Sequence, residues 1–253
     1  MVGTDLRRRV SAITSTRRTA RIAGVFFLLT FITSIPAAFY FCEPVLTHAD
    51  YVASAGADTR VAWGAVLEVF LAITGIGTAV TLYPVLRRQS EGIAIGYVAA
   101  RVVESTLIVV GIVSLMSVVT LRQGAAGADS ASLLVAGRSL VAVHDWTFLL
   151  GPGLVAGFAN GLMLGYLLYR SRLVPRAMAL LGVIGGPLIF VSGIAVLLGA
   201  YPQISTVSAI ATIPEFLWEL SLGLYLVVKG FRPSALTVET QPRQPETPAP
   251  AVL

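Results

Sequence analysis

The stretch IAIGYVAARVVESTLIVVGIVSLMSVVT, residues 93–120, decides the fold. It contains only two charged side chains, Arg101 and Glu104, and at 1.5 Å per residue a helix of this length covers about 42 Å. The hydrocarbon core of a bilayer is about 30 Å thick and offers no hydrogen bonds to the backbone. The run therefore predicts a membrane-spanning α-helix with the lipid bilayer as its solvent.

The rest of the chain repeats this pattern. Five further apolar runs are separated by short polar segments, and the 253 residues are 56% hydrophobic and 12% charged, with a mean hydropathy of +0.82. Soluble proteins carry about 25% charged residues, so water is not the main solvent of this chain. The sequence predicts an all-α polytopic bundle with six spans, at residues 22–42, 61–86, 93–120, 146–169, 175–199 and 207–229.

Basic residues are distributed unevenly between the segments that join these spans. Most of the 18 Lys and Arg residues lie in the N-terminal segment, the second and fourth loops and the tail, whereas only Arg60, Arg122 and Arg138 lie in the opposite loops. Because basic residues concentrate on the cytoplasmic side, we expect both termini in the cytoplasm of a bacterial inner-membrane protein. The expected parts are a basic cytoplasmic segment (1–20), a six-helix transmembrane domain (21–232) and a disordered Pro-rich cytoplasmic tail (233–253).

Several stretches also resemble a known family. They are ARIAG (20–24), TAVTLYPVLRRQSEGIAIGYVAARVVES (78–105), HDWTFLLGPG (144–153), NGLMLGYLLYRSRLVPR (160–176) and PEFLWELSLGLYLVVKGFRP (214–233). Over about residues 20–233 the chain resembles the bacterial membrane family known as domain of unknown function 4386. The resemblance implies a helical membrane fold and brings no established activity, ligand or catalytic residue.

Four ionisable residues fall at membrane depth: Glu68, Arg101, Glu104 and Glu219. Each costs about 2.5–3.5 kcal/mol on insertion scales, so we expect them to face the bundle interior and to meet in one polar pocket. Arg101 and Glu104 are three residues apart on one helix face, which predicts an ion pair. Glu68 and Glu219 have no basic partner in the sequence, so each either stays protonated or binds a cation. The alternative is that these glutamates hydrogen-bond neighbouring helices and only stabilise the fold.

The sequence His144-Asp145-Trp146 opens the predicted fourth span after a loop over 121–145. Asp145 is a suitable N-cap, and Trp146 suits the aromatic belt at a membrane interface. Alternatively, His144 and Asp145 are ligands at the mouth of the glutamate pocket. No closely spaced second histidine or cysteine cluster supports a metal site.

Glycines and prolines mark the last three spans. Gly153, Gly157, Gly161 and Gly165 recur every four residues, which predicts close helix packing within the chain or, alternatively, a homodimer interface. Helix breakers occur at 151–153, 185–187 and 213–215. If Pro214 begins the last helix, the segment before it is a half-helix or re-entrant.

The chain contains no P-loop, no GxGxxG after a strand, no GxSxG and no HExxH, so no cofactor, nucleic acid or familiar hydrolytic reaction is expected. The favoured function is the binding or transport of a proton, a cation or a small polar or amphipathic molecule at the glutamate pocket. Two alternatives stay open: a non-catalytic regulatory or scaffold protein, with a homo-oligomer as one form, and an intramembrane enzyme acting on a lipid-like substrate.

Overall fold

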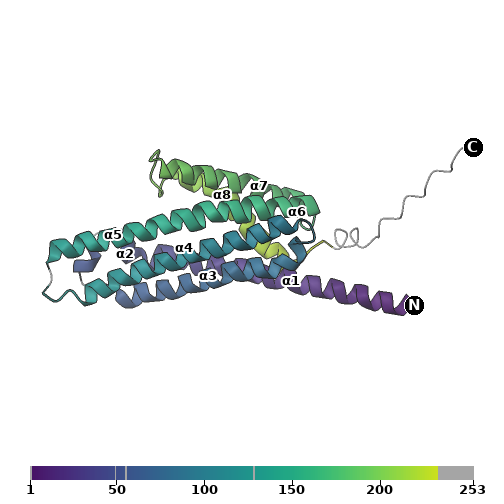
Figure 1. Ribbon diagram of the computed structural model, residues 1–253, viewed down its shortest axis with the longest axis horizontal. Coiled ribbons are helices and arrows are strands. Elements are labelled where there is room, and N and C mark those ends of the chain that lie inside the picture. Colours follow the sequence, from purple (N-terminus) through teal and green to yellow (C-terminus); the bar gives the residue numbers. More distant parts are fainter. Residues whose placement is uncertain (1, 49, 55, 128, 233–253) are drawn as a thin grey trace, which may run out of the picture.

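The computed structural model describes residues 2–232 except 49, 55 and 128, and side chains from residue 16 onward. These residues are mostly helical, and none of them lies in a strand (Figure 1). The predicted disordered tail, 233–253, lies outside the described residues. Six helical stretches are long and apolar enough to cross a membrane, which confirms the predicted number of spans: Thr16–Phe41, Asp58–Leu86, Glu91–Gln123, Ser130–Ser171, Arg176–Leu197 and Thr206–Val228.

The elements follow one another along the chain in a simple order. The first span is α1 (Val2–Pro36), which continues into the π-helical η1 (Ala37–Phe41). The short helices α2 (Glu43–Thr47) and η2 (Tyr51–Ala53) lead to α3 (Asp58–Leu86) and α4 (Glu91–Gln123). The fourth span consists of α5 (Ser130–Phe148), the π-helical η3 (Leu149–Val155) and η4 (Gly157–Leu164), and α6 (Gly165–Ser171). The last two spans are α7 (Arg176–Leu197) and α8 (Thr206–Val228).

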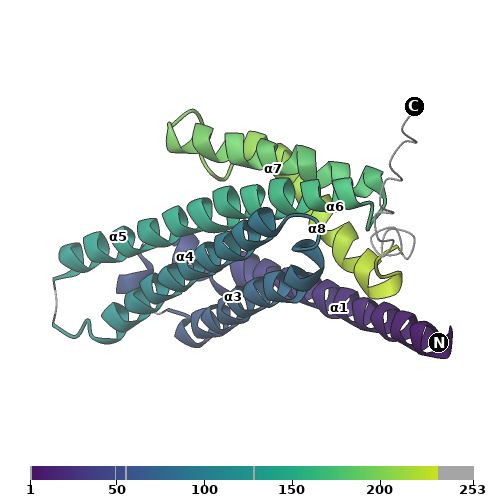
Figure 2. The ribbon, with the colours of Figure 1, turned by 45° about the vertical axis from the view of Figure 1, so that its right-hand side comes forward.

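The six spans form a ring in which each packs against its neighbours in the chain. α1 packs on α3, α3 on α4 and α4 on α5, while η4 and α6 pack on α7 and α7 packs on α8. The ring closes because α8 returns to α1 (Figure 2). We call the end where α1 begins and α3 turns into α4 the proximal end, and the opposite end, with α2 and the start of α5, the distal end (Figure 1).

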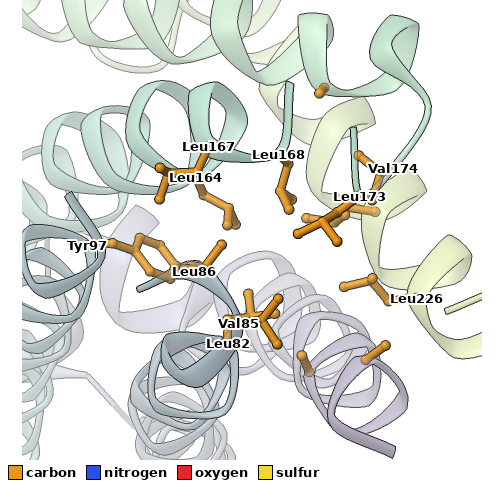
Figure 3. Close-up of a cluster of buried hydrophobic side chains, with 14 of the residues drawn as sticks. Leu82, Val85, Leu86, Tyr97, Leu164, Leu167, Leu168, Leu173, Val174 and Leu226 are labelled. Atoms are coloured by element: carbon orange, nitrogen blue, oxygen red, sulfur yellow. The ribbon is translucent and has the colours of Figure 1, made fainter. Parts of the chain in front are cut away.

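Apolar side chains cover both the inside and the outside of this ring. Near the proximal end, Tyr97, Leu86 and Leu168 are fully buried in one cluster, and Figure 3 shows Tyr97 of α4 beside Leu86 of α3. On the outside, large apolar side chains such as Phe39 and Val191 are exposed. A soluble protein rarely exposes so much apolar surface, whereas lipid-facing helices require it.

The fourth span differs from the prediction. Its helix begins at Ser130, and the N-cap is Asp129, whose side chain accepts a hydrogen bond from the backbone N–H of Ser132 at 2.9 Å. The predicted loop over 121–145 is therefore mostly helix, and Asp145 lies within α5 and is not a cap. Hydropathy missed this stretch because its Ser, Gly and Arg residues are polar or small, although they are compatible with a capped helix.

The prediction of broken helices is also wrong for the last two spans. α7 continues through Pro187, and α8 runs from Thr206 through Pro214, so no half-helix precedes Pro214. Membrane helices tolerate proline because neighbouring groups can satisfy the freed backbone carbonyls. The start of the first span also differs from the prediction, because α1 begins at Val2 and not near residue 22. Of the prolines at the three predicted helix breakers, only Pro152 coincides with altered helix geometry, since it lies in the π-helical η3.

Candidate functional site

Charged side chains are buried at two depths of the bundle. Arg101 and Glu104 of α4 form an ion pair in which Nη1 donates to Oε2 at 2.6 Å, and only 5% and 7% of the two side chains are exposed. This is the pair that their i, i+3 spacing predicts. The Arg101 guanidinium also reaches α3, where Nε donates to the carbonyl oxygen of Gly75 at 3.4 Å. Gly75 leaves space for the guanidinium, because a Cβ there would stand 2.9 Å from Arg101 Nη2 and the side chain would have to shift.

Glu219 joins this pair from α8. Its Oε1 accepts a hydrogen bond from Asn160 Nδ2 at 2.5 Å, and it interacts electrostatically with both Arg101 and Glu104. Asn160 is buried in η4, where its carbonyl oxygen also accepts a hydrogen bond from Trp218 Nε1 at 2.9 Å. Glu219, which lacks a partner in the sequence, therefore has an amide donor from the fourth span.

Glu215 lies one helical turn before Glu219, on the same face of α8. Only 4% of this residue is exposed, and neither carboxyl oxygen has a hydrogen-bond partner among the described residues. It is wedged against two other helices, because a Cβ on Gly161 would stand 2.6 Å from its Oε2 and one on Gly185 would stand 2.6 Å from its backbone nitrogen.

The hydroxyl of Tyr97 completes this group. It is fully buried, has no hydrogen-bond partner among the described residues, and interacts electrostatically with Arg101 and all three glutamates. We call the set Arg101, Glu104, Glu215, Glu219, Asn160 and Tyr97 the central cluster. Sequence reasoning missed three of its members. These are Glu215, Asn160 and Tyr97. The i, i+4 spacing of Glu215 and Glu219 could have indicated Glu215. Asn160 and Tyr97 join the cluster only through the packing of η4 and α4.

Glu68 contacts a different set of side chains, nearer the distal end. Its Oε1 lies 3.4 Å from His144 Nε2 and 3.9 Å from the thiol of Cys42, while its Oε2 has no partner. The His144 side chain is 5% exposed, and its imidazole stacks on Phe148 with 4.4 Å between ring centroids. On the other side of the ring, Nδ1 lies 3.7 Å from Asp145 Oδ1, beyond hydrogen-bond distance, and has no hydrogen-bond partner among the described residues. We call Glu68, His144 and Asp145 the distal triad.

The predicted acids are thus divided between two levels. Glu68 lies seven residues before Gly75 on α3, which corresponds to about 10 Å along the helix. Because Gly75 marks the level of Arg101, the distal triad lies roughly that far from the central cluster. In the described part of the chain, no group of three His, Cys, Asp or Glu side chains is arranged to hold a metal ion.

Three of the four regularly spaced glycines pack on α7 of the same chain. Gly161 contacts the Cα of Gly186, Gly157 contacts Ile189 and the carbonyl oxygen of Gly186, and Gly165 faces Val183. A Cβ on Gly153 would meet only atoms of its own helix, at 3.7 Å and beyond. Close approach through these glycines brings η4 and α7 together around Glu215.

The ring of six apolar spans with ionisable side chains buried inside it defines a polytopic helical membrane protein. The profile of the family described as Domain of unknown function (DUF4386) matches residues 22–230, so the chain belongs to this family. Comparison with curated proteins and with solved structures found no match.

Proposed function

We propose that the protein binds protons at the central cluster and moves them across the membrane. The observation that carries this proposal is the Glu215 carboxyl, which is buried and has no hydrogen-bond donor among the described residues. An isolated carboxylate in such surroundings costs far more free energy than a neutral carboxylic acid. A bound proton is the smallest group that removes this cost.

The charge balance of the central cluster supports the same conclusion. Glu104, Glu215 and Glu219 face a single guanidinium, that of Arg101, so the fully ionised cluster would carry a net charge of −2. Charges that are buried without partners are strongly unfavourable, and mutual repulsion of neighbouring carboxylates adds to the cost. The surplus negative charge must be neutralised by protons or by a bound cation.

Packing favours protons over larger ligands. The Glu215 carboxyl packs closely against Gly161, and Oε1 of Glu219 already accepts a hydrogen bond from the Asn160 amide. Mg²⁺ and Ca²⁺ need six or more oxygen ligands, and no group of three acidic, histidine or cysteine side chains suited to a metal is found among the described residues. A proton needs only one oxygen atom, and a buried glutamate that alternates between its two forms is suited to transport.

The proposal is tested by proton flux into proteoliposomes driven by a potassium diffusion potential. Glu215→Gln and Glu219→Gln keep the size of each side chain but remove the titratable group, so each should lower the flux strongly. Glu91→Gln is the matched control, because Glu91 lies exposed in the first turn of α4, outside the central cluster. The proposal is overturned if wild-type liposomes conduct no more than empty ones, or if Glu215→Gln conducts like wild type.

A further inference from the structure

His144 connects an exposed acid to a buried one. Both ring nitrogens lie beside carboxyl oxygens, with Nε2 3.4 Å from Glu68 and Nδ1 3.7 Å from Asp145. The Glu68 side chain is 1% exposed, whereas 58% of the Asp145 side chain is exposed. An imidazole can accept a proton on one nitrogen and release one from the other. Its position is therefore that of a bridge from the protein surface to the interior.

Two cavities at the distal end meet at this acid. One has a volume of about 210 Å³ and the other about 530 Å³, and both are lined by Ala142 and Asp145 of α5. A cavity needs only some 10–15 Å³ to hold a water molecule, so each can bring water to the Asp145 carboxylate. Water thus reaches the Asp145 carboxylate, while the imidazole behind it is buried and lines neither cavity.

The surroundings of His144 contain few other charges. From α3 it faces Glu68, and from its own helix it faces Asp145 and the ring of Phe148. α4 contributes Gly111, where a Cβ would stand 3.2 Å from the imidazole Cδ2. Cys42 lies behind Glu68, with its thiol 3.9 Å from Oε1. The described carboxyl groups near the ring nitrogens are thus Glu68 beside Nε2 and Asp145 near Nδ1.

We propose that the distal triad is the proton access path of this protein, leading from water in the two cavities through Asp145 and His144 to Glu68. In each transfer water protonates the Asp145 carboxylate, the imidazole takes that proton on Nδ1, and it releases the proton on Nε2 to the Glu68 carboxylate. Exchange of the ring tautomer then restores the starting state, so one proton passes from water to Glu68. This inference rests on the proposed proton function and adds the side of access and the residues that provide it.

The first test replaces the imidazole by an amide. His144→Gln retains a donor that can reach Glu68 but cannot carry a proton, so a purely structural role would survive the change. We expect proton flux to fall about a hundredfold and to lose its dependence on the pH at the distal face. Glu91→Gln is the control, because Glu91 lies exposed in the first turn of α4, outside the distal triad and both cavities.

The second test blocks the cavities. Ala142 lines both cavities, so Ala142→Cys is the test variant. Ser139 lies exposed on the same helix but lines neither cavity, so Ser139→Cys is the control. Labelling with a bulky, membrane-impermeant thiol reagent should reduce flux only in the Ala142→Cys protein. If wild-type protein carries no flux at all, the proposed function fails. If wild-type flux persists equally in His144→Gln and in labelled Ala142→Cys, the access path is wrong while the central cluster stands.

Discussion

Gly161 and Glu215 depend on each other. The absence of a side chain at Gly161 lets η4 lie against α7 at Gly186, and the same space receives the Glu215 carboxyl. A methyl group there would meet Gly186 backbone atoms and Glu215 Oε2 together, and backbone atoms cannot move aside as the end of a flexible side chain can. The lack of a methyl group at Gly161 thus allows both the close packing of η4 on α7 and the position of the Glu215 carboxyl.

Gly161→Ala should therefore destabilise the protein by about 1–3 kcal/mol, the usual cost of overpacking a closely packed interior. Gly153→Ala is the matched control, because the nearest atoms to its added Cβ stand at 3.7 Å and 3.8 Å, an ordinary contact distance. Thermal unfolding of both variants in the same detergent provides the comparison. Equal unfolding temperatures for the two variants would contradict the close packing of η4 on α7.

Some residue pairs could be predicted from the sequence and others could not. The Arg101–Glu104 ion pair follows from helical spacing alone, and the structure confirms it. The contact between Glu68 and His144 joins residues 76 positions apart, and Asn160 reaches Glu219 across 59 positions. Contacts at such distances depend on which helices become neighbours and on their rotation about their axes, and a single sequence does not specify either.

At the level of elements, the fourth span is the least regular. It begins with a conventional capped helix, α5, and widens into the π-helical η3 and η4 before it ends in α6. π-helical turns often occur at functional sites, and here η4 carries Asn160, the donor to Glu219. Hydropathy predicted that a span exists here. It could not predict the polar first turns of α5 or the wider helix, because neither changes the apolar content.

The start of α5 should depend on Asp129. Removing its carboxylate in Asp129→Ala leaves the first turn without a cap, so amide hydrogens around Ser132 should exchange faster with solvent. Hydrogen bonds from Ser132 hold the Asp129 pKa below its usual value. A lowered folded-state pKa means that the stabilisation is present at neutral pH and is lost as the pH falls through that pKa.

Hydrogen exchange followed by mass spectrometry measures this effect, with Ser205→Ala at the N-cap of α8 as a parallel case. Exchange in α5 should rise in Asp129→Ala alone. An unchanged α5 would mean that the helix starts further along the chain, as the hydropathy pattern had predicted.

For the whole molecule, the apolar runs were sufficient to predict six spans, because length and hydropathy determine whether a helix can cross a bilayer. Length and hydropathy could not predict that the spans close into a ring or that the buried charges lie at two levels. The orientation stays a prediction. It places the proximal end, with Arg87, Arg88 and Arg170, in the cytoplasm and the distal end outside.

Cysteine labelling in intact cells tests this orientation. The native Cys42 is fully buried and should not react, so it can remain in place. A cysteine at Ala126, in the turn between α4 and α5, should react with an impermeant maleimide in intact cells. One at Gly92, where nothing lies within 4 Å of an added Cβ, should react only after the cells are permeabilised. The reverse pattern would place the distal triad on the cytoplasmic side.

The most direct test of the central claim is to observe the bound protons themselves by infrared spectroscopy. Protonated carboxyl groups give a band separate from that of carboxylates, and it shifts when the proton is replaced by deuterium. We expect wild-type protein at neutral pH to show such a band, and Glu215→Gln to lose part of it while Glu91→Gln keeps it. A wild-type spectrum without this band, or a band that Glu215→Gln and Glu219→Gln leave unchanged, would contradict the account of the central cluster.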